Sequence, residues 1–104
     1  MIEERKEKYA EVLEKCSILL VAVRREAASE RFVSYARMVR NAGSLREVRK
    51  ICSKVRWSFG GPKGGLEEAY AIHADGSVDR EASHAYDAAL REVWKYSCPL
   101  RWLI

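Results

Sequence analysis

Apolar residues recur at three- and four-residue steps in four stretches of this chain, a spacing typical of helices that bury one face. The first stretch predicts a helix over roughly residues 2–26. Its apolar positions are Tyr9, Val12, Leu13, Cys16, Leu19, Leu20 and Val23. The run at 18–23 alone would suit a buried strand, but the longer period around it favours a helix.

A second helix is predicted over roughly 30–42, with Ser29 as its N-cap. Its apolar stripe is formed by Phe32, Tyr35, Ala36 and Val39. The sequence Asn41-Ala42-Gly43 indicates the end of this helix, because Gly43 can take the left-handed conformation after the last turn.

The sequence Ser44-Leu45-Arg46-Glu47 is a capping box and starts a third predicted helix, which extends to about Ser58. The apolar face of this helix consists of Leu45, Val48, Ile51, Cys52 and Val55. At about 100° per residue, that face lies opposite a basic stripe. The stripe consists of Arg46, Arg49, Lys50 and Lys54, and Arg37 and Arg40 of the second helix are expected near it.

The segment 60–65 cannot continue a helix, because it contains four glycines and Pro62. Residues 70–72 are predicted either as extended chain or as the end of a short helix that begins at residue 66. Asp75-Gly76 forms a turn, and Ser77 or Asp79 caps a last helix over roughly 79–97, which ends before Pro99. Its inward positions are Ala82, Ala85, Tyr86, Ala89, Leu90, Val93 and Tyr96.

These elements predict a mainly α-helical fold: one compact domain of four helices over residues 1–104. An irregular glycine-rich connection precedes the last helix, and a short extended segment within it is an alternative. A length of 104 residues suits a single domain. Ten aromatic residues can bury enough surface to offset chain entropy, which argues against disorder.

The net charge of +4 is segregated along the chain. Residues 31–57 contain eight basic side chains and one acid, Glu47, whereas the segments before and after them are each slightly acidic. The eight bases are Arg31, Arg37, Arg40, Arg46, Arg49, Lys50, Lys54 and Arg56. A local excess of this size creates a field that selects partners.

The cysteines Cys16, Cys52 and Cys98 lie far apart and form no Cys-x-x-Cys pair. This excludes a zinc ribbon and argues against a disulfide framework, so a reducing compartment is the simpler expectation. The glutamates near the amino terminus do not suit a signal peptide. The apolar run 18–23 is far shorter than the ~20 residues needed to span a bilayer. We therefore expect a cytoplasmic protein with no membrane partner.

The loop Phe59-Gly60-Gly61-Pro62-Lys63-Gly64-Gly65-Leu66-Glu67-Glu68 follows the third predicted helix. The order of elements together with this loop resembles a family of small bacterial helical domains of unknown function, whose turn reads approximately Phe-Gly-Gly-Met-Gly-Ser. Gly60, Gly61 and Gly64 match this turn, whereas Gly65 replaces the Ser and Pro62-Lys63 replaces the Met. The resemblance implies a bacterial, cytoplasmic, single-domain protein and implies no reaction. Domains of this type look like the immunity proteins that protect bacteria against delivered toxins.

No catalytic signature accompanies these features. The glycine loop can present N–H groups to a phosphate, but it lacks the Lys-Ser/Thr of a P-loop, and a tight chain reversal is the simpler interpretation. With Lys63, Glu67 or Asp87, the histidines His73 and His84 can supply an acid–base pair, yet nothing in their spacing indicates that they meet. No ligand pair has metal-site spacing. We predict no catalytic, cofactor-binding or metal-binding residues.

The basic segment suits a solvated face, a protein interface or a nucleic-acid interface. The leading hypothesis is a non-enzymatic protein-binding module of bacterial immunity or antitoxin type, which covers the active site of an acidic partner such as a toxin. The alternative is a nucleic-acid-binding module, for which Trp57 is the only candidate aromatic. Trp94 and Tyr96 are expected in the core, and Trp102 is expected to be partly exposed and to anchor an interface. The predicted partner-binding residues are Arg37, Arg40, Arg46, Arg49, Lys50, Lys54, Lys63 and Trp102.

Overall fold

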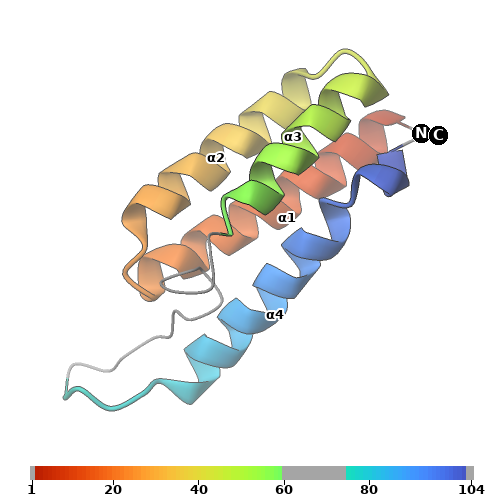
Figure 1. Cartoon of the computed structure of the whole chain (residues 1–104). Coiled ribbons are helices and arrows are strands. Elements are labelled where there is room, and N and C mark those ends of the chain that lie inside the picture. The colour runs from red at the N-terminus through yellow and green to blue at the C-terminus, as the bar shows by residue number, and fades with distance from the viewer. Residues whose placement is uncertain (1, 60–74, 103–104) are drawn as a thin grey trace.

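The computed structural model of this chain describes residues 2–59 and 75–102, and these residues form a mainly α-helical fold (Figure 1). The elements are α1 (Ile2–Ala22), α2 (Glu26–Asn41), α3 (Leu45–Trp57), α4 (Arg80–Tyr96) and the 3-10 helix η2 (Pro99–Trp102). The predicted fold class of four helices is confirmed. The predicted glycine-rich connection at 60–65 and the alternatives for residues 70–72 lie outside the described residues.

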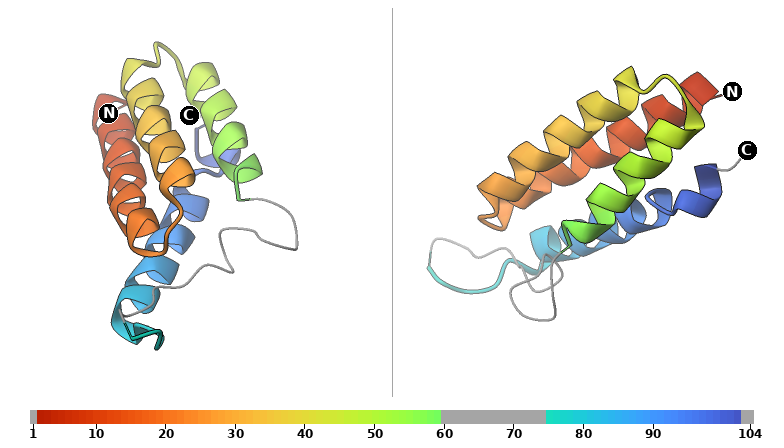
Figure 2. Two further views of the ribbon diagram at one scale, coloured as in Figure 1. Left: turned by 90° about the vertical axis from the view of Figure 1, so that its left-hand side faces the viewer. Right: turned by 45° about the horizontal axis from the view of Figure 1, so that its top comes forward.

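Helix α1 is the central element of the fold, because it packs against both α2 and α4. The helices α1 and α2 form an antiparallel pair, and α3 returns alongside α2 (Figures 1 and 2). Helix η2 packs against α3 near the start of α1, so the first and last described elements meet at one end of the bundle (Figure 2).

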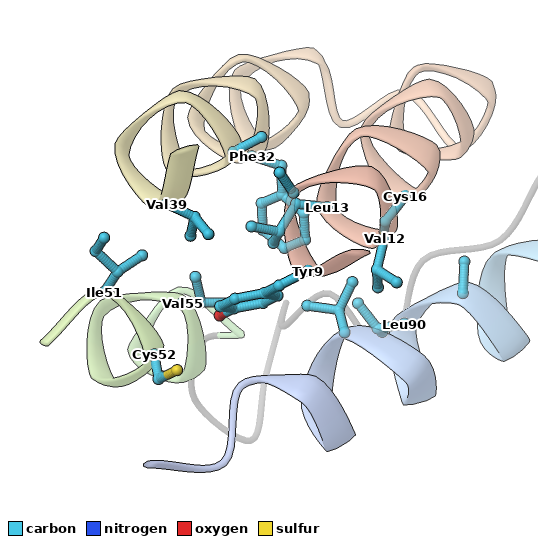
Figure 3. Close-up of a cluster of buried hydrophobic side chains, with 14 of the residues drawn as sticks. Tyr9, Val12, Leu13, Cys16, Phe32, Val39, Ile51, Cys52, Val55 and Leu90 are labelled. Carbon is cyan, nitrogen blue, oxygen red and sulfur yellow. The ribbon is translucent and has the colours of Figure 1, made fainter. Parts of the chain in front are cut away.

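The core is built from the inward faces that the apolar spacing predicts (Figure 3). Tyr9 is fully buried, and its ring extends from α1 toward Val55 and Cys52 of α3. Its hydroxyl group shares a 2.6 Å hydrogen bond with the hydroxyl of Ser97, which is also fully buried. The largest fully buried hydrophobic side chains are Tyr9, Leu13, Cys16, Leu20, Phe32, Val39, Val48, Cys52, Val55, Tyr86 and Val93.

The boundary between the first two helices differs from the prediction. Helix α1 ends at Ala22, and the chain turns through Arg24, which has a positive φ of 61°. Helix α2 begins at Glu26, so Ser29 lies inside α2 and is not its N-cap. The buried Ser29 hydroxyl instead donates a 2.7 Å hydrogen bond to the carbonyl of Ser17 on α1. A tertiary partner has replaced the local backbone partner that a capping serine would use.

The end of α2 also departs from the prediction that Gly43 adopts a left-handed conformation. Among the described glycines only Gly76 has a positive φ, of 92°, and it lies in the predicted Asp75-Gly76 turn. Helix α2 ends through an extended Ala42, whose carbonyl accepts a 2.7 Å hydrogen bond from the buried ammonium group of Lys6. A side chain from α1 therefore supplies the partner for the carbonyl of the C-cap residue, which has none within the helix.

The predicted N-caps of the last two helices are confirmed. The Glu47 N–H group donates a 3.3 Å hydrogen bond to the Ser44 hydroxyl at the start of α3. The Glu47 carboxylate accepts a 2.6 Å hydrogen bond from the Gly43 N–H group, one residue before the usual capping-box partner. At the start of α4, Asp79 and not Ser77 is the cap, because its carboxylate accepts a 3.0 Å hydrogen bond from the Ala82 N–H group.

The inward face of α4 is narrower than predicted. Tyr86, Ala89, Leu90 and Val93 are buried, but Ala85 is exposed. At about 100° per residue, Ala85 lies at the edge of this stripe, where the curved surface of a helix turns toward solvent.

The three thiols differ in accessibility. Cys16 and Cys52 are fully buried, whereas Cys98 is half-buried, and all three are free. Burial raises the pKa of the Cys16 thiol to about 12 and that of the Cys52 thiol to about 11. Since the thiolate is the reactive form, both thiols are protected from reagents in solution by their burial and by remaining protonated.

We expect a thiol-specific chromogenic disulfide reagent at pH 8 to modify one thiol of the native protein quickly and the other two only as fast as the protein unfolds. A Cys98→Ser variant is expected to lose the fast phase, and guanidinium is expected to release all three thiols at once. A Cys98→Ser protein that retains a fast phase would contradict the burial of Cys16 and Cys52.

Candidate binding face on helices α2 and α3

The predicted basic residues of α2 and α3 fall into two groups, and the first group is used within the fold. Arg40 donates hydrogen bonds to the carboxylates of Glu7, at 2.8–2.9 Å, and of Glu14, at 2.7–2.8 Å. Arg49 donates a 2.8 Å hydrogen bond to the carbonyl of Trp102. Arg40 therefore connects α2 to α1, and Arg49 connects α3 to η2. Because two carboxylates neutralise Arg40, its positive charge is not available to a partner.

The Arg40 guanidinium also changes the titration of its two carboxylate partners. Its hydrogen bonds hold the pKa values of Glu7 and Glu14 below their ordinary value of 4.5. The Glu7 and Glu14 side chains are 50% and 42% exposed, so screening by solvent keeps the energetic effect modest. Because the unfolded chain takes up protons first, the stabilisation is complete at neutral pH and is lost as the pH falls below about 4.5 through the lowered pKa values.

We expect an Arg40→Gln variant to be less stable than the wild type at pH 7, with a difference that disappears by about pH 2, where both carboxyl groups are protonated. Urea unfolding at a series of pH values measures this difference. Arg37→Gln is the matched control on the same helix, since Arg37 pairs with no described carboxylate. A difference for Arg40→Gln that stays constant from pH 7 to pH 2 would contradict the assigned ion pairs.

The second group of bases is exposed and unpaired. Arg37, Arg46, Lys50 and Lys54 are all exposed, and none forms a hydrogen bond or ion pair with another described residue. Arg46, Lys50 and Lys54 follow one another at four-residue steps and therefore lie on one face of α3. Arg31, which the prediction omitted, is likewise exposed on α2 and has no partner among the described residues.

A groove of about 480 Å³ lies between α2 and α3 and brings three of these exposed, unpaired bases together. Arg37 contributes from α2, and Lys50 and Lys54 contribute from α3. Apolar side chains also line the groove: Met38 is half-buried, and Ala42 and Ile51 are each 5% exposed. Its remaining lining residues are Ser34, Asn41 and Glu47. The groove therefore combines an apolar surface with a basic rim.

Trp57 is a candidate binding residue that the sequence indicated as an aromatic for a nucleic-acid interface but that is not among the predicted partner-binding residues. Its side chain is 85% exposed, the most exposed large hydrophobic group in the described chain. It lies seven residues after Lys50 and therefore on the same exposed face of α3. We define the basic face as Arg37, Arg46, Lys50, Lys54 and Trp57. The signal for Trp57 in the sequence is its position opposite the apolar stripe of α3.

Trp102 does not belong to the basic face, and the expectation that it is partly exposed is wrong. Its side chain is only 2% exposed, and its indole N–H group donates a 3.0 Å hydrogen bond to the Tyr96 carbonyl. Its ring centroid lies 5.6 Å from that of Tyr9, and the Arg5 guanidinium lies 4.7 Å from the Trp102 ring. The opposite error concerns Trp94, which was expected in the core and is 42% exposed.

Trp94 lies at the edge of the core and contacts an arginine. The Arg56 guanidinium lies 4.0 Å from the Trp94 ring centroid and donates a 2.8 Å hydrogen bond to the Trp94 carbonyl. The Phe59 ring packs edge-on against the same indole, with 5.0 Å between centroids. Arg56 is thus a third base of the 31–57 segment that serves the fold.

The other candidate groups contribute no chemistry to this face. Lys63, Glu67 and His73 lie outside the described residues, and His84 is exposed on α4. Within residues 2–59 and 75–102, no three His, Cys, Asp or Glu side chains gather to hold a metal ion. Of the described helices, none combines the length and apolar composition needed to cross a bilayer.

The chain matches no known protein-family model, and no curated protein or solved structure matches it significantly. What the basic face can bind follows from its own charges and shape.

Proposed function

We propose that this chain is a non-enzymatic, cytoplasmic binding protein of bacterial immunity or antitoxin type, which neutralises a protein partner by docking an acidic surface of that partner on the basic face. One observation carries this proposal: the four bases of the basic face are exposed and have no partner among the described residues, although three neighbouring bases do. The fold satisfies some of its bases internally and leaves these four available.

The physical basis is electrostatic complementarity. Unpaired like charges on one face attract an acidic surface before contact and raise the association rate, and salt screens the effect. Trp57 adds an exposed aromatic group, a residue type that often dominates binding energy in protein interfaces. A basic inhibitor implies an acidic target, so the partner's active site or its rim should be rich in Asp and Glu.

The proposal is tested with the product of the gene adjacent to the one that encodes this chain. We expect that product to arrest bacterial growth when expressed alone and to permit growth when this chain is co-expressed. An Arg46→Glu/Lys50→Glu variant is expected to fold, as judged by circular dichroism, and to fail to restore growth. A Lys95→Glu variant changes an exposed base on α4 and should restore growth. A harmless neighbour that does not bind this chain would count against the immunity function.

Nucleic acid is the second candidate partner, and the exposure of Trp57 favours it. An indole group beside a row of bases can stack on an unpaired base while the bases contact phosphates. This function requires binding of a single-stranded oligonucleotide that weakens as salt rises, by roughly 0.7 log units per log unit of salt for each phosphate neutralised. A gel-shift titration at low and moderate salt measures this. No retention at low salt, or retention unchanged in Arg46→Glu/Lys50→Glu, would eliminate this candidate.

A further inference from the structure

The groove between α2 and α3 is lined by apolar as well as charged residues. A partner held by charge attraction alone would leave these apolar groups without contacts. Helices α2 and α3 run antiparallel and are joined through residues 42–44 (Figure 1). Ala42 and Glu47 therefore lie at the closed end of the groove, and Ser34 and Lys54 lie at the other end. The half-buried Met38 and the nearly buried Ile51, which is 5% exposed, come between these ends, so the groove has an apolar centre, with Met38 as its more exposed side chain, flanked along its length by polar and charged groups.

The groove is basic beside its apolar centre and acidic only at its closed end. Arg37 and Lys50 are the immediate sequence neighbours of Met38 and Ile51, and Lys54 follows one turn later on α3. The only acid among the lining residues, Glu47, lies at the closed end, and its carboxylate accepts the 2.6 Å hydrogen bond from Gly43. A complementary ligand therefore needs apolar groups at its centre and carboxylates on its flanks.

The length of the groove sets the size of such a ligand. The α3 lining residues extend from Glu47 to Lys54, which is about 10 Å along a helix at a rise of about 1.5 Å per residue. About two turns of an α-helix have this length. An amphipathic helix with apolar residues at i, i+4 and i+7 presents a stripe of this kind, with its flanks free to carry acids.

We propose that the groove binds one acidic amphipathic α-helix of the partner protein, with the apolar stripe of that helix on Met38 and Ile51 and its carboxylates beside Arg37, Lys50 and Lys54. This inference rests on the proposed function and names the element that the partner contributes. Helix-in-groove recognition uses spaced apolar anchors in this way. A sugar–phosphate backbone matches the basic rim of the groove and leaves its apolar centre unfilled.

The test uses two fluorescein-labelled peptides of about 18 residues, long enough for an amphipathic helix to form on binding. Both contain the same Leu, Ala and Glu residues. One has Leu at i, i+4 and i+7, and the other is a scramble without this period. Fluorescence anisotropy with the full chain at moderate salt is expected to show at least about ten-fold tighter binding of the amphipathic peptide. Amide shifts in the nuclear magnetic resonance spectrum should map that peptide to α2 and α3.

Three variants of α2 separate the groove from the rest of the surface. Met38→Gln makes the groove polar without changing charge and should weaken binding of the amphipathic peptide about ten-fold. Val33→Gln is the matched control, because Val33 is 40% exposed on the same helix and does not line the groove. Met38→Leu keeps the apolar surface and should retain binding, which distinguishes loss of the contact from loss of the fold.

The possible outcomes separate this inference from the proposed function. Equal binding of both peptides, weakened equally by Lys50→Gln, would overturn the helix-in-groove inference and leave an acidic partner in place. Binding of neither peptide would also overturn it, while the growth experiment would still decide the immunity function. Displacement of the amphipathic peptide by a single-stranded oligonucleotide that binds more tightly would overturn it in favour of nucleic acid.

Discussion

Replacement of Trp102 by alanine is expected to lower the free energy of unfolding by about 3–5 kcal/mol, the usual cost of removing a large buried aromatic side chain. The Trp102 ring is 2% exposed and packs beside Tyr9. The substitution leaves a cavity between α1 and η2 and also removes the hydrogen bond to the Tyr96 carbonyl. Against a typical total of about 5–15 kcal/mol for a folded domain, this loss is large.

Urea unfolding monitored by circular dichroism measures this effect, and the chain contains its own control. Trp57 is 85% exposed, so Trp57→Ala should change the unfolding free energy by less than about 0.5 kcal/mol. The two substitutions remove the same side chain and differ only in its surroundings. Equal losses for the two variants would show that η2 does not pack against the bundle as described.

Replacement of Lys6 by methionine is expected to destabilise the protein by about 1–3 kcal/mol, the cost of leaving a buried polar group without a partner. The Lys6 residue is only 5% exposed, and its ammonium group donates to the Ala42 carbonyl at the end of α2. A positive charge at this position also interacts favourably with the carboxyl-terminal end of the α2 dipole. Methionine fills a similar volume but can neither donate the hydrogen bond nor carry the charge.

Lys8→Met is the matched control for Lys6→Met, because Lys8 is an exposed lysine on the same helix. We expect its unfolding free energy to stay within about 0.5 kcal/mol of the wild type. Glu3 forms a 3.0 Å ion pair with Lys6 but is 78% exposed, so Glu3→Gln should have a small effect that salt reduces further. A Lys6→Met protein as stable as Lys8→Met would show that the end of α2 does not depend on α1.

The candidate face could be predicted only in part, because neighbouring bases on one helix have different tertiary surroundings. Arg46 and Arg49 are three residues apart on α3, yet Arg46 is unpaired among the described residues and Arg49 donates to Trp102. Arg40 was predicted to face a partner, and it instead joins two glutamates of α1 that lie 26 and 33 residues before it. A charge pattern along the chain cannot distinguish these cases, because it contains no information about which helix packs beside each base.

Sequence patterns alone were enough to predict the four helices, most of their inward faces, the cap at Ser44 and the choice of Ser77 or Asp79 as the last cap. These signals act between residues within about four positions, so each segment carries its own information. Three outcomes became apparent only from the packed helices: Ser29 and Lys6 bind another helix, Trp102 is buried, and the bases of the basic face remain unpaired among the described residues. Those outcomes depend on contacts between residues far apart in the chain, and such contacts exist only once the helices have packed.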